Sequence, residues 1–595
     1  MCDVVKRVAV AISVWFAVVC GWTVSQPQAL QQSQASRPPE AAAGTNPGLD
    51  EGVPISNDLV KRKCSACHKA DEKGHLSRIS YRRTTPEGWE ETIKRMVGLH
   101  GLQLDQAEGR EILRYLADHL GLAPEEAKAA SFEVEHRIVD YRYTADKDTE
   151  ETCTKCHSMG RVMSQRRTKE EWGLVVTMHR AYYPYVDFQA FRQTAAQRRA
   201  GQTDGRPADN RQPMDKAIAH LSSAFPLKTP DWAAWSATMR PPQLTGRWAV
   251  VGYQANKGPL FGQVMIATQG DPANGTFTTE STLTYARSAQ TVTRRGRAIV
   301  YTGFQWRGTS TSETALAPGV ETDLREVMFV DQDWQHAAGR WFTGAYGELG
   351  IDVHLRRIGT DPIVLGVGQP MIKSGGAPQD VQLYGVNLPS RVSVGDVSFG
   401  PGITVDRISG VTSDHLVVSV SVSPNATPGR RAVLLLGAMS DAAVFLYDKI
   451  DFIKVRPEAG LSRVGGIQFP KQFAQFEAIA YLNGPDGKAD TKDDIELGLV
   501  DALWGLEEYP ATYDDDDKDF VGNIDPESGF FTPNVDGPNP KRKHNANNYG
   551  DVWVTATYPR RPQSVDSSIE PLKARAHLLV TLPLYIRFDQ PEVGR

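Results

Sequence analysis

The sequence predicts a multidomain chain, in which an α-helical N-terminal domain precedes three mainly antiparallel β domains, a barrel and immunoglobulin-like sandwiches. Three observations lead to this prediction. At 595 residues the chain is too long for a single hydrophobic core. The helical spacing of apolar residues stops near Gln243, where short segments of alternating apolar and polar residues begin. The 52 glycines and 37 prolines favour turn-rich β structure over a helical bundle.

The composition narrows the class of protein. With 40% hydrophobic and 23% charged residues, the chain is globular in character. Its net charge of −5 and its lack of a basic patch interleaved with aromatic residues argue against nucleic-acid binding. It contains no phosphate-binding loop, no H-E-x-x-H motif and no recognisable Ser/His/Asp or Cys/His nucleophile pattern. We therefore expect no catalytic residue in this chain.

The first residues have the features of an export signal. Lys6 and Arg7 precede an apolar run, Val8–Val19, which is too short to span a bilayer comfortably. This pattern predicts a signal peptide over residues 1–25, followed by a disordered leader over residues 26–52. No other segment is a candidate for a membrane span. We therefore expect a periplasmic protein, exported across the inner membrane of a Gram-negative bacterium.

One short pattern occurs twice, as Cys64-Ser65-Ala66-Cys67-His68 and as Cys153-Thr154-Lys155-Cys156-His157. Each copy is a C-x-x-C-H, the signature of covalent c-type haem attachment. Two thiols at this spacing reach the vinyl groups of one porphyrin, and the adjacent histidine binds the iron as proximal ligand. The predicted attachment residues are Cys64, Cys67, Cys153 and Cys156, and the predicted proximal ligands are His68 and His157. The remaining two of the six cysteines lie in the predicted signal peptide.

Helix signals follow both motifs and predict a tandem dihaem cytochrome c domain over residues 53–240, with units of about 53–130 and 131–240. In the first unit, Thr85 and Pro86 open a helix, and Gly98 and Gly101 are expected to end it. The apolar stripe expected along this helix is Trp89, Ile93, Met96 and Val97. Asp105 opens a second helix in capping-box style.

The plan then repeats, because Arg166-Arg167-Thr168 mirrors Arg82-Arg83-Thr84. The second copy departs from the first after its main helix. A polar insertion over Arg192–Pro213 is expected to precede a short helical remnant, Met214–Leu221.

The repeat also suggests the sixth iron ligands. Met96 lies seven residues after Trp89, and His179 lies seven residues after Trp172. This parallel predicts one His/Met haem and one bis-His haem. Because thioether ligation raises the reduction potential relative to a second imidazole, such a pair would form a directional relay. The alternatives are His100 in the first unit, beyond the expected helix break at Gly98, and Met178 or Met163 in the second.

Three β domains are expected to follow. Residues 241–360 read as a barrel, whose Gly246-Arg247-Trp248 resembles the opening of calycin barrels. Residues 361–452 read as an immunoglobulin-like sandwich without a disulfide. Residues 453–595 read as a C-terminal β domain with acidic loops, in which the long segment Trp504–Tyr549 is expected to form an interface rather than a core.

One acidic loop, Asn483–Asp494, supplies clustered oxygen donors. It lacks the glutamate that closes an EF-hand loop by bidentate ligation. Calcium binding and a solvated acidic turn both remain open for this loop.

The order of these domains, together with Thr245–Trp248 and the segment Trp504-Gly505-Leu506-Glu507-Glu508-Tyr509-Pro510, resembles the α subunit of quinohaemoprotein amine dehydrogenases. The resemblance covers essentially the whole mature chain. It implies partners, namely a β-propeller subunit and a small γ subunit that holds a cysteine tryptophylquinone cofactor. It also implies the reaction: the γ subunit oxidises a primary amine to an aldehyde and ammonia, and electrons leave through two haems of the α subunit to a soluble cupredoxin or cytochrome c.

Two other functions compete with this one. A stand-alone dihaem enzyme of the cytochrome c peroxidase type would need a haem with an open or displaceable distal site. Strong distal ligands on both haems would argue against this function. A β-scaffold protein for adhesion or carbohydrate binding, with an electron-transfer appendage, would need exposed aromatic residues on a β face.

Overall fold

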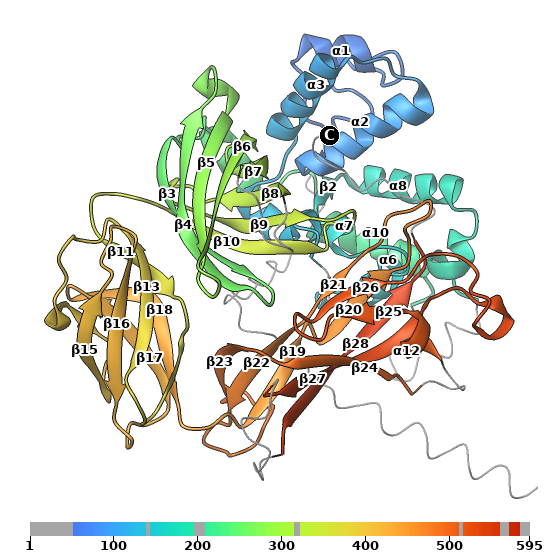
Figure 1. Ribbon diagram of the computed structural model, residues 1–595. Coiled ribbons are helices and arrows are strands. Elements are labelled where there is room, and N and C mark those ends of the chain that lie inside the picture. The colour runs from blue at the N-terminus through green and yellow to red at the C-terminus, as the bar shows by residue number, and fades with distance from the viewer. Residues whose placement is uncertain are drawn as a thin grey trace, which may run out of the picture.

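The computed structural model describes residues 51–137, 143–194, 209–313, 322–510, 516–559 and 570–583. The predicted signal peptide and nearly all of the predicted leader lie outside these ranges. The fold class predicted from the sequence is confirmed, since a helical domain precedes three mainly β domains (Figure 1). None of the helices in the described ranges is long and apolar enough to cross a membrane.

The helical domain contains two similar units (blue and teal in Figure 1). The elements of the first unit are α1 (Asp58–Cys64), β1 (Arg82–Thr84), α2 (Pro86–His100), α3 (Gln106–His119), α4 (Pro124–Lys128) and α5 (Ser131–Val134). Those of the second unit are α6 (Lys147–Cys153), α7 (Gly160–Met163), β2 (Gln165–Arg167), α8 (Lys169–Tyr182), η1 (Asp187–Phe191) and α10 (Pro213–Ala224), and α11 (Pro230–Thr238) leads to the barrel.

The predicted helix starts are confirmed. Thr85 caps α2 by accepting a hydrogen bond from the backbone N–H of Gly88, and Asp105 forms a capping box with Glu108 at the start of α3. The predicted break at Gly98 is wrong. The α2 helix continues to His100 and ends at Gly101, which adopts a φ of +70°. A single glycine inside a helix costs only about 1 kcal/mol, whereas a left-handed cap ends the helix.

Two further expectations for this domain are corrected. Val97, placed in the apolar stripe, is 43% exposed, because the end of α2 projects beyond the core. The supposed helical remnant is the full helix α10, whose Met214, Ala217 and Leu221 are buried. Part of the polar insertion before it, residues 195–208, lies outside the described residues.

The structure also shifts the internal repeat by one residue. Strands β1 and β2 pair antiparallel, with Arg83 directly opposite Arg166. The helix caps that follow are Thr85 and Thr168, so Arg83 corresponds to Arg166 rather than to Arg167. The two units are therefore related by an approximate two-fold axis that passes through this arginine pair. The tryptophans of α2 and α8 follow the same symmetry. The indole N–H of Trp89 donates to the backbone oxygen of Leu120, which caps α3, and that of Trp172 donates to the backbone oxygen of Phe225, which caps α10.

The barrel is closed and of the up-and-down type, with each strand paired to the next and β10 paired to β3. Its elements are β3 (Gly246–Gln254), β4 (Gly258–Thr268), η2 (Pro272–Asn274), β5 (Thr276–Tyr285), β6 (Gln290–Tyr301), β7 (Gln305–Ser312), β8 (Asp323–Val330), β9 (His336–Thr343) and β10 (Leu349–Arg357). Trp248 is buried at one end, where its indole N–H donates to Leu244 O over 2.8 Å and Arg357 lies over its ring.

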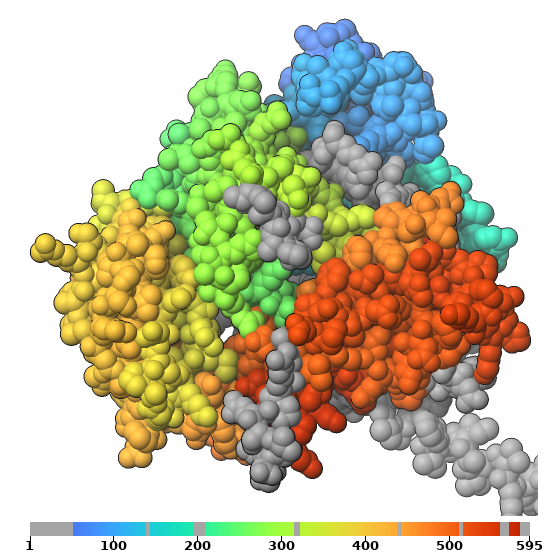
Figure 2. Space-filling model, viewed as in Figure 1, coloured from blue at the N-terminus to red at the C-terminus, as the bar shows by residue number. Residues whose placement is uncertain are grey.

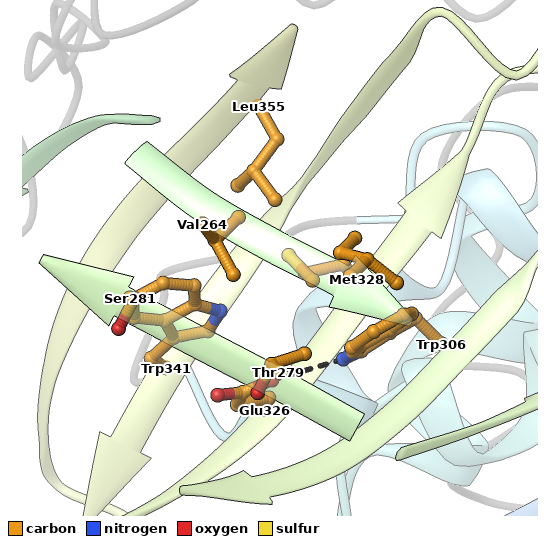
Figure 3. A pocket seen from close by; sticks show the side chains of 9 residues that line it. Val264, Thr279, Ser281, Trp306, Glu326, Met328, Trp341 and Leu355 are labelled. Atoms are coloured by element: carbon orange, nitrogen blue, oxygen red, sulfur yellow. Dashed lines mark hydrogen bonds between the residues drawn. The ribbon is translucent and has the colours of Figure 1, made fainter. Parts of the chain in front are cut away.

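Side chains fill the lumen of this barrel (Figure 3). Trp306, Trp341, Met328 and Leu355 line it, and the space they leave is too small for more than about one water molecule. Glu326 accepts a hydrogen bond from the indole N–H of Trp306 over 3.0 Å, and burial raises the pKa of its carboxyl. The inward aromatic residues therefore form a packed core rather than a ligand pocket.

The third domain is a sandwich of two four-stranded sheets, ordered β11-β13-β16-β15 and β12-β18-β17-β14. Its elements are β11 (Ile363–Val367), β12 (Met371–Lys373), β13 (Gln379–Val386), η3 (Val394–Asp396), β14 (Val397–Ser398), β15 (Ile403–Ser409), β16 (His415–Val422), β17 (Gly429–Leu435) and β18 (Ala438–Tyr447). The domain contains no cysteine, so aliphatic packing between the sheets takes the place of a disulfide.

The C-terminal domain contains three small sheets, ordered β19-β22-β23, β20-β28-β27-β24 and β21-β26-β25. Its elements are β19 (Phe452–Arg456), β20 (Ala459–Arg463), β21 (Ala474–Gln475), β22 (Glu477–Leu482), β23 (Ile495–Val500), β24 (Leu503–Glu508), α12 (Asp517–Phe520), β25 (Gly522–Ile524), β26 (Phe530–Pro533), η4 (Lys543–Asn545), β27 (Gly550–Tyr558) and β28 (Leu572–Thr581).

Two sequence-based expectations concern loops of this domain. The segment Trp504–Tyr549 is not only interface material, because Trp504, Val521 and Phe531 are buried in the domain core. In the acidic loop, Asp494 accepts hydrogen bonds from the backbone N–H groups of Gly484 and Thr491. This carboxylate stabilises the turn itself, and calcium binding there stays a prediction.

The barrel contacts all three other domains and fixes their positions. Thr302 donates its backbone N–H to Asp118 of the helical domain over 2.6 Å, Phe261 stacks on Tyr384 of the sandwich, and Tyr253 donates to Glu477 of the C-terminal domain over 2.7 Å. The C-terminal domain (orange to red) lies directly against the barrel (green) in the space-filling view (Figure 2). A buried ion pair between Glu87, in the first turn of α2, and Arg307, on β7, adds a second tie to the helical domain.

Candidate haem centres

Both C-x-x-C-H motifs begin at the last residue of a short helix. Cys64 ends α1 and Cys153 ends α6. In the first motif the backbone N–H groups of Cys67 and His68 both donate to Cys64 O, over 3.2 and 2.9 Å. These two hydrogen bonds close a tight turn, which fixes the backbone of the three motif residues. One cysteine of each motif is half-buried and the other is exposed, as attachment to a porphyrin edge at the protein surface requires.

The first cysteine of each motif is partly buried. Burial raises the pKa of Cys64 to about 11 and that of Cys153 to about 12. Both thiols are therefore protonated at neutral pH as long as nothing is bound to them. Within the described residues, the group of three potential metal ligands that lies close together is Asp331, Asp333 and His336, which includes no cysteine.

Backbone hydrogen bonds orient the motif histidines. The Nδ1–H of His68 donates to Ser77 O over 2.8 Å, and that of His157 donates to Ser158 O over 2.9 Å. A carbonyl oxygen only accepts, so each Nδ1 carries the proton and each Nε2 keeps its lone pair. This is the tautomer that an iron-binding imidazole needs, held by the kind of outer hydrogen bond that metal-ligating histidines use.

His179 faces His157 across the second site. It lies on α8, and its Nδ1–H donates to Val175 O over 2.8 Å, which again leaves Nε2 available. The two ring centroids are 6.4 Å apart. A metal–imidazole bond is about 2 Å and the ring centre lies about 1 Å further back, so two axial imidazoles on one ion have centroids roughly 6 Å apart. The pair therefore fits a bis-His haem.

The surroundings of this pair favour neutral imidazoles. Burial is the main cause that lowers the pKa of both His157 and His179. The two sequence-based rivals are placed differently. The Sδ of Met178 accepts a hydrogen bond from Arg95 of the first unit over 3.4 Å, and Met163 is buried in the cluster that contains Trp172 and Leu221.

In the first unit, Met96 is half-buried on α2 at the position that corresponds to His179 on α8. His100, the rival, is the last residue of α2 and is exposed. The continuation of the helix through Gly98 places the two candidates one turn apart on the same helix. Met96 therefore stays the predicted distal ligand of the first haem, with His100 as its alternative.

Sequence reasoning missed the contacts between the two units beside these sites. Arg161 on α7 forms an ion pair with Glu91 on α2 at 2.6 Å, and Arg95 on α2 reaches Met178 on α8. The partners of each contact are 70 or more residues apart in the sequence, so no local sequence pattern predicts these contacts.

The comparisons with known proteins match family models along most of the chain. Residues 55–215 match the model "Quinohemoprotein amine dehydrogenase A, alpha subunit, haem binding". Residues 241–358, 361–448 and 453–593 match the models for domains II, III and IV of the same alpha subunit. The chain belongs to the quinohaemoprotein amine dehydrogenase α-subunit family. It is thus a haem-binding subunit of an oxidoreductase family whose α subunit has partner subunits.

Other comparisons add little to this family membership. No curated protein matches the chain. Among solved structures, a redesigned β-barrel is 16% identical over 20% of this chain and 92% of its own, with a TM-score of 0.16. The extracellular cadherin domains 1–5 of protocadherin gamma B2 are 11% identical over 57% of this chain and 72% of theirs, with a TM-score of 0.15. Scores this low carry no argument about fold or function.

Removing one attachment motif should remove one haem. We expect the variant with Cys64→Ser and Cys67→Ser, and separately the variant with Cys153→Ser and Cys156→Ser, to retain a single covalent haem, because each pair of thiols serves one porphyrin. Intact-mass spectrometry of the denatured chain and a haem stain give the count. Two covalent haems in either variant, or none in the unaltered chain, would rule out the assignment.

Proposed function

We propose that this α-subunit family member is the electron-transfer subunit of a periplasmic quinohaemoprotein amine dehydrogenase. Electrons would arrive from a tryptophylquinone on a partner subunit, where a primary amine is oxidised to an aldehyde and ammonia. They would leave through two covalently bound c-type haems to a soluble cupredoxin or cytochrome c. The amine-oxidising residues would lie on another chain.

The observation that carries the proposal is the pair of C-x-x-C-H motifs within the region that matches the family's haem-binding model. Haem iron bound there supplies one-electron transfer at a potential set by its axial ligands and surroundings. His157 and His179 would hold the second iron from opposite faces, and His68 with Met96 would hold the first. The Met/His set favours the higher potential, which would give the relay a direction.

The scaffold supports this role by fixing the haem domain. The ion pair of Glu87 and Arg307 joins the first turn of α2, the helix that carries Met96, to the barrel. Asp118 and Thr302 join α3 to the same barrel. Electron transfer between fixed sites needs constant separations, and a helical domain anchored at several points keeps them. The large β scaffold would also present the surfaces on which a β-propeller subunit and a small γ subunit assemble.

Purification from periplasm without added partner chains tests this assembly. We expect a complex in which the chain co-elutes with a propeller subunit and with a small polypeptide that carries a cross-linked quinone, both identified by mass spectrometry. A lone chain that consumes peroxide and ignores amines would overturn the proposal and favour a peroxidase-type enzyme.

A further inference from the structure

Charged residues from both units meet beside His157 and His179. Arg161, on α7, follows His157 by four residues, and Arg95, on α2, contacts the residue that precedes His179. Glu91 lies one helical turn before Arg95 on α2 and pairs with Arg161. The two arginines and the glutamate are called the inter-unit charge cluster below.

The charges in the inter-unit charge cluster do not cancel. The Nη2 of Arg161 is 2.6 Å from the Oε1 of Glu91, and both side chains are about three-quarters buried. Arg95 makes no ion pair with any carboxylate among the described residues, and its Nη1 instead donates to the Sδ of Met178 over 3.4 Å. Two positive charges and one negative charge give the inter-unit charge cluster itself a net charge of +1.

The charges of several arginines act on His179. Burial is the main cause of its lowered pKa, and Arg161, Arg167 and Arg95 add to that effect in this order. Arg167 is paired with Glu171 at 3.4 Å and therefore stays outside the inter-unit charge cluster. Arg161 and Arg95 also act on Tyr183, whose ring lies 6.2 Å from that of His179. Glu91 acts on His157 with the opposite sign. Partly buried charges act through a lower effective dielectric than water and are weakly screened by salt.

We propose that Arg95 and Arg161 are positioning residues that raise the reduction potential of the second haem, and that Glu91 opposes them. The inference rests on the proposed function, in which that haem is held by His157 and His179. Oxidised iron carries one more positive charge than reduced iron, so nearby positive charge favours reduction. Bis-His ligation by itself lowers the potential relative to His/Met ligation. The inter-unit charge cluster therefore reduces the difference in reduction potential between the two haems. A smaller difference makes electron exchange between them easier in both directions.

Charge variants of the purified complex test the proposal through the sign of their effects. We expect Arg95→Gln and Arg161→Gln to lower the potential of the second haem and Glu91→Gln to raise it. Arg161→Lys, which keeps the charge, should stay near the unaltered value. Lys94→Gln is the matched control, since Lys94 lies on the same helix and pairs with Glu90 instead. Potentiometric titration followed by optical and EPR spectra resolves the two haems.

Opposite shifts from the arginine and glutamate variants cannot arise from a general loosening of the site, which would move all of them in one direction. Shifts of one sign in all three variants, or no shift in any, would overturn the inference. Failure of the proposed function looks different, because the unaltered protein would then lack a low-spin bis-His haem or would ignore amines. A bis-His haem that amines reduce, with a potential indifferent to these charges, would contradict the inference alone.

Discussion

Replacing His179 with alanine is expected to convert the second haem from a six-coordinate, low-spin state to a high-spin state with an open distal position. His179 is the imidazole that faces His157 at a centroid distance suited to one iron between them. A methyl group supplies no lone pair, so the iron would keep His157 alone. The first haem, in a separate unit, should keep its spectrum. Optical and EPR spectra of the oxidised protein measure this change.

The neighbouring residue gives the matched control. Met178→Leu preserves volume and removes the rival sulfur, and we expect it to leave the low-spin spectrum intact. A second variant, His179→Met, should keep the iron of the second haem six-coordinate. It should also raise the reduction potential of that haem, because thioether ligation favours the reduced state. A low-spin second haem in His179→Ala, or its loss in Met178→Leu, would show that the distal ligand is misassigned.

Replacing Glu126 with glutamine should destabilise the helical domain by roughly 3–5 kcal/mol, the cost of breaking a buried ion pair by removing one partner. The Glu126 side chain is 3% exposed and lies between Arg83, at 2.8 Å, and Arg166, at 3.1 Å. These two arginines face each other in the β1–β2 pair that relates the two units. Without the carboxylate, the two buried guanidinium groups would lose the side chain that forms an ion pair with both of them.

The contribution of Glu126 to stability is expected to fall as the pH becomes acidic. Burial acts to raise the pKa of Glu126, but the hydrogen bond from Arg83 and the charge of Arg166 outweigh it and lower the pKa to about 2, from 4.5. A carboxyl whose pKa is lowered by folding stabilises the protein fully above its unfolded pKa. That contribution is lost as the pH falls from about 4.5 through about 2.

Thermal unfolding of the helical domain, followed through the haem absorbance at several pH values, measures both effects. Glu125→Gln is the matched control, because Glu125 is exposed on the same short helix, α4. We expect the difference between the Glu126 and Glu125 variants to be large at neutral pH and to shrink below pH 4. Equal unfolding temperatures at neutral pH would contradict the role of Glu126.

Features written in short stretches of sequence were predicted well. The caps at Thr85 and Asp105 and the alternating strands of the barrel each depend on residues only a few positions apart. Periodicity also located the position shared by Met96 and His179. Such signals are local because a helix or a strand is itself a local pattern of backbone hydrogen bonds.

The misses depend on contacts that are distant in sequence or on competition between residues. Gly98 alone could not end α2 while Gly101 offered a left-handed cap three residues later. The one-residue shift of the repeat shows in the β1–β2 register, which needs both units in place. Trp504 and Phe531 pack in the same core, but a long segment rich in loops separates them in the sequence. Their contact could therefore not be predicted from local patterns. The charges around Glu126 and Arg95 come together only after the two units pack.

An anaerobic titration of the oxidised complex with a primary amine tests the electron-transfer role most directly. Oxidation of one amine to an aldehyde and ammonia releases two electrons, and two haem irons accept one electron each. We therefore predict that, without an external acceptor, about one equivalent of amine per complex reduces both haems, and that aldehyde appears in the same proportion. Aldehyde formation with both haems still oxidised would show that the electrons do not pass through this chain.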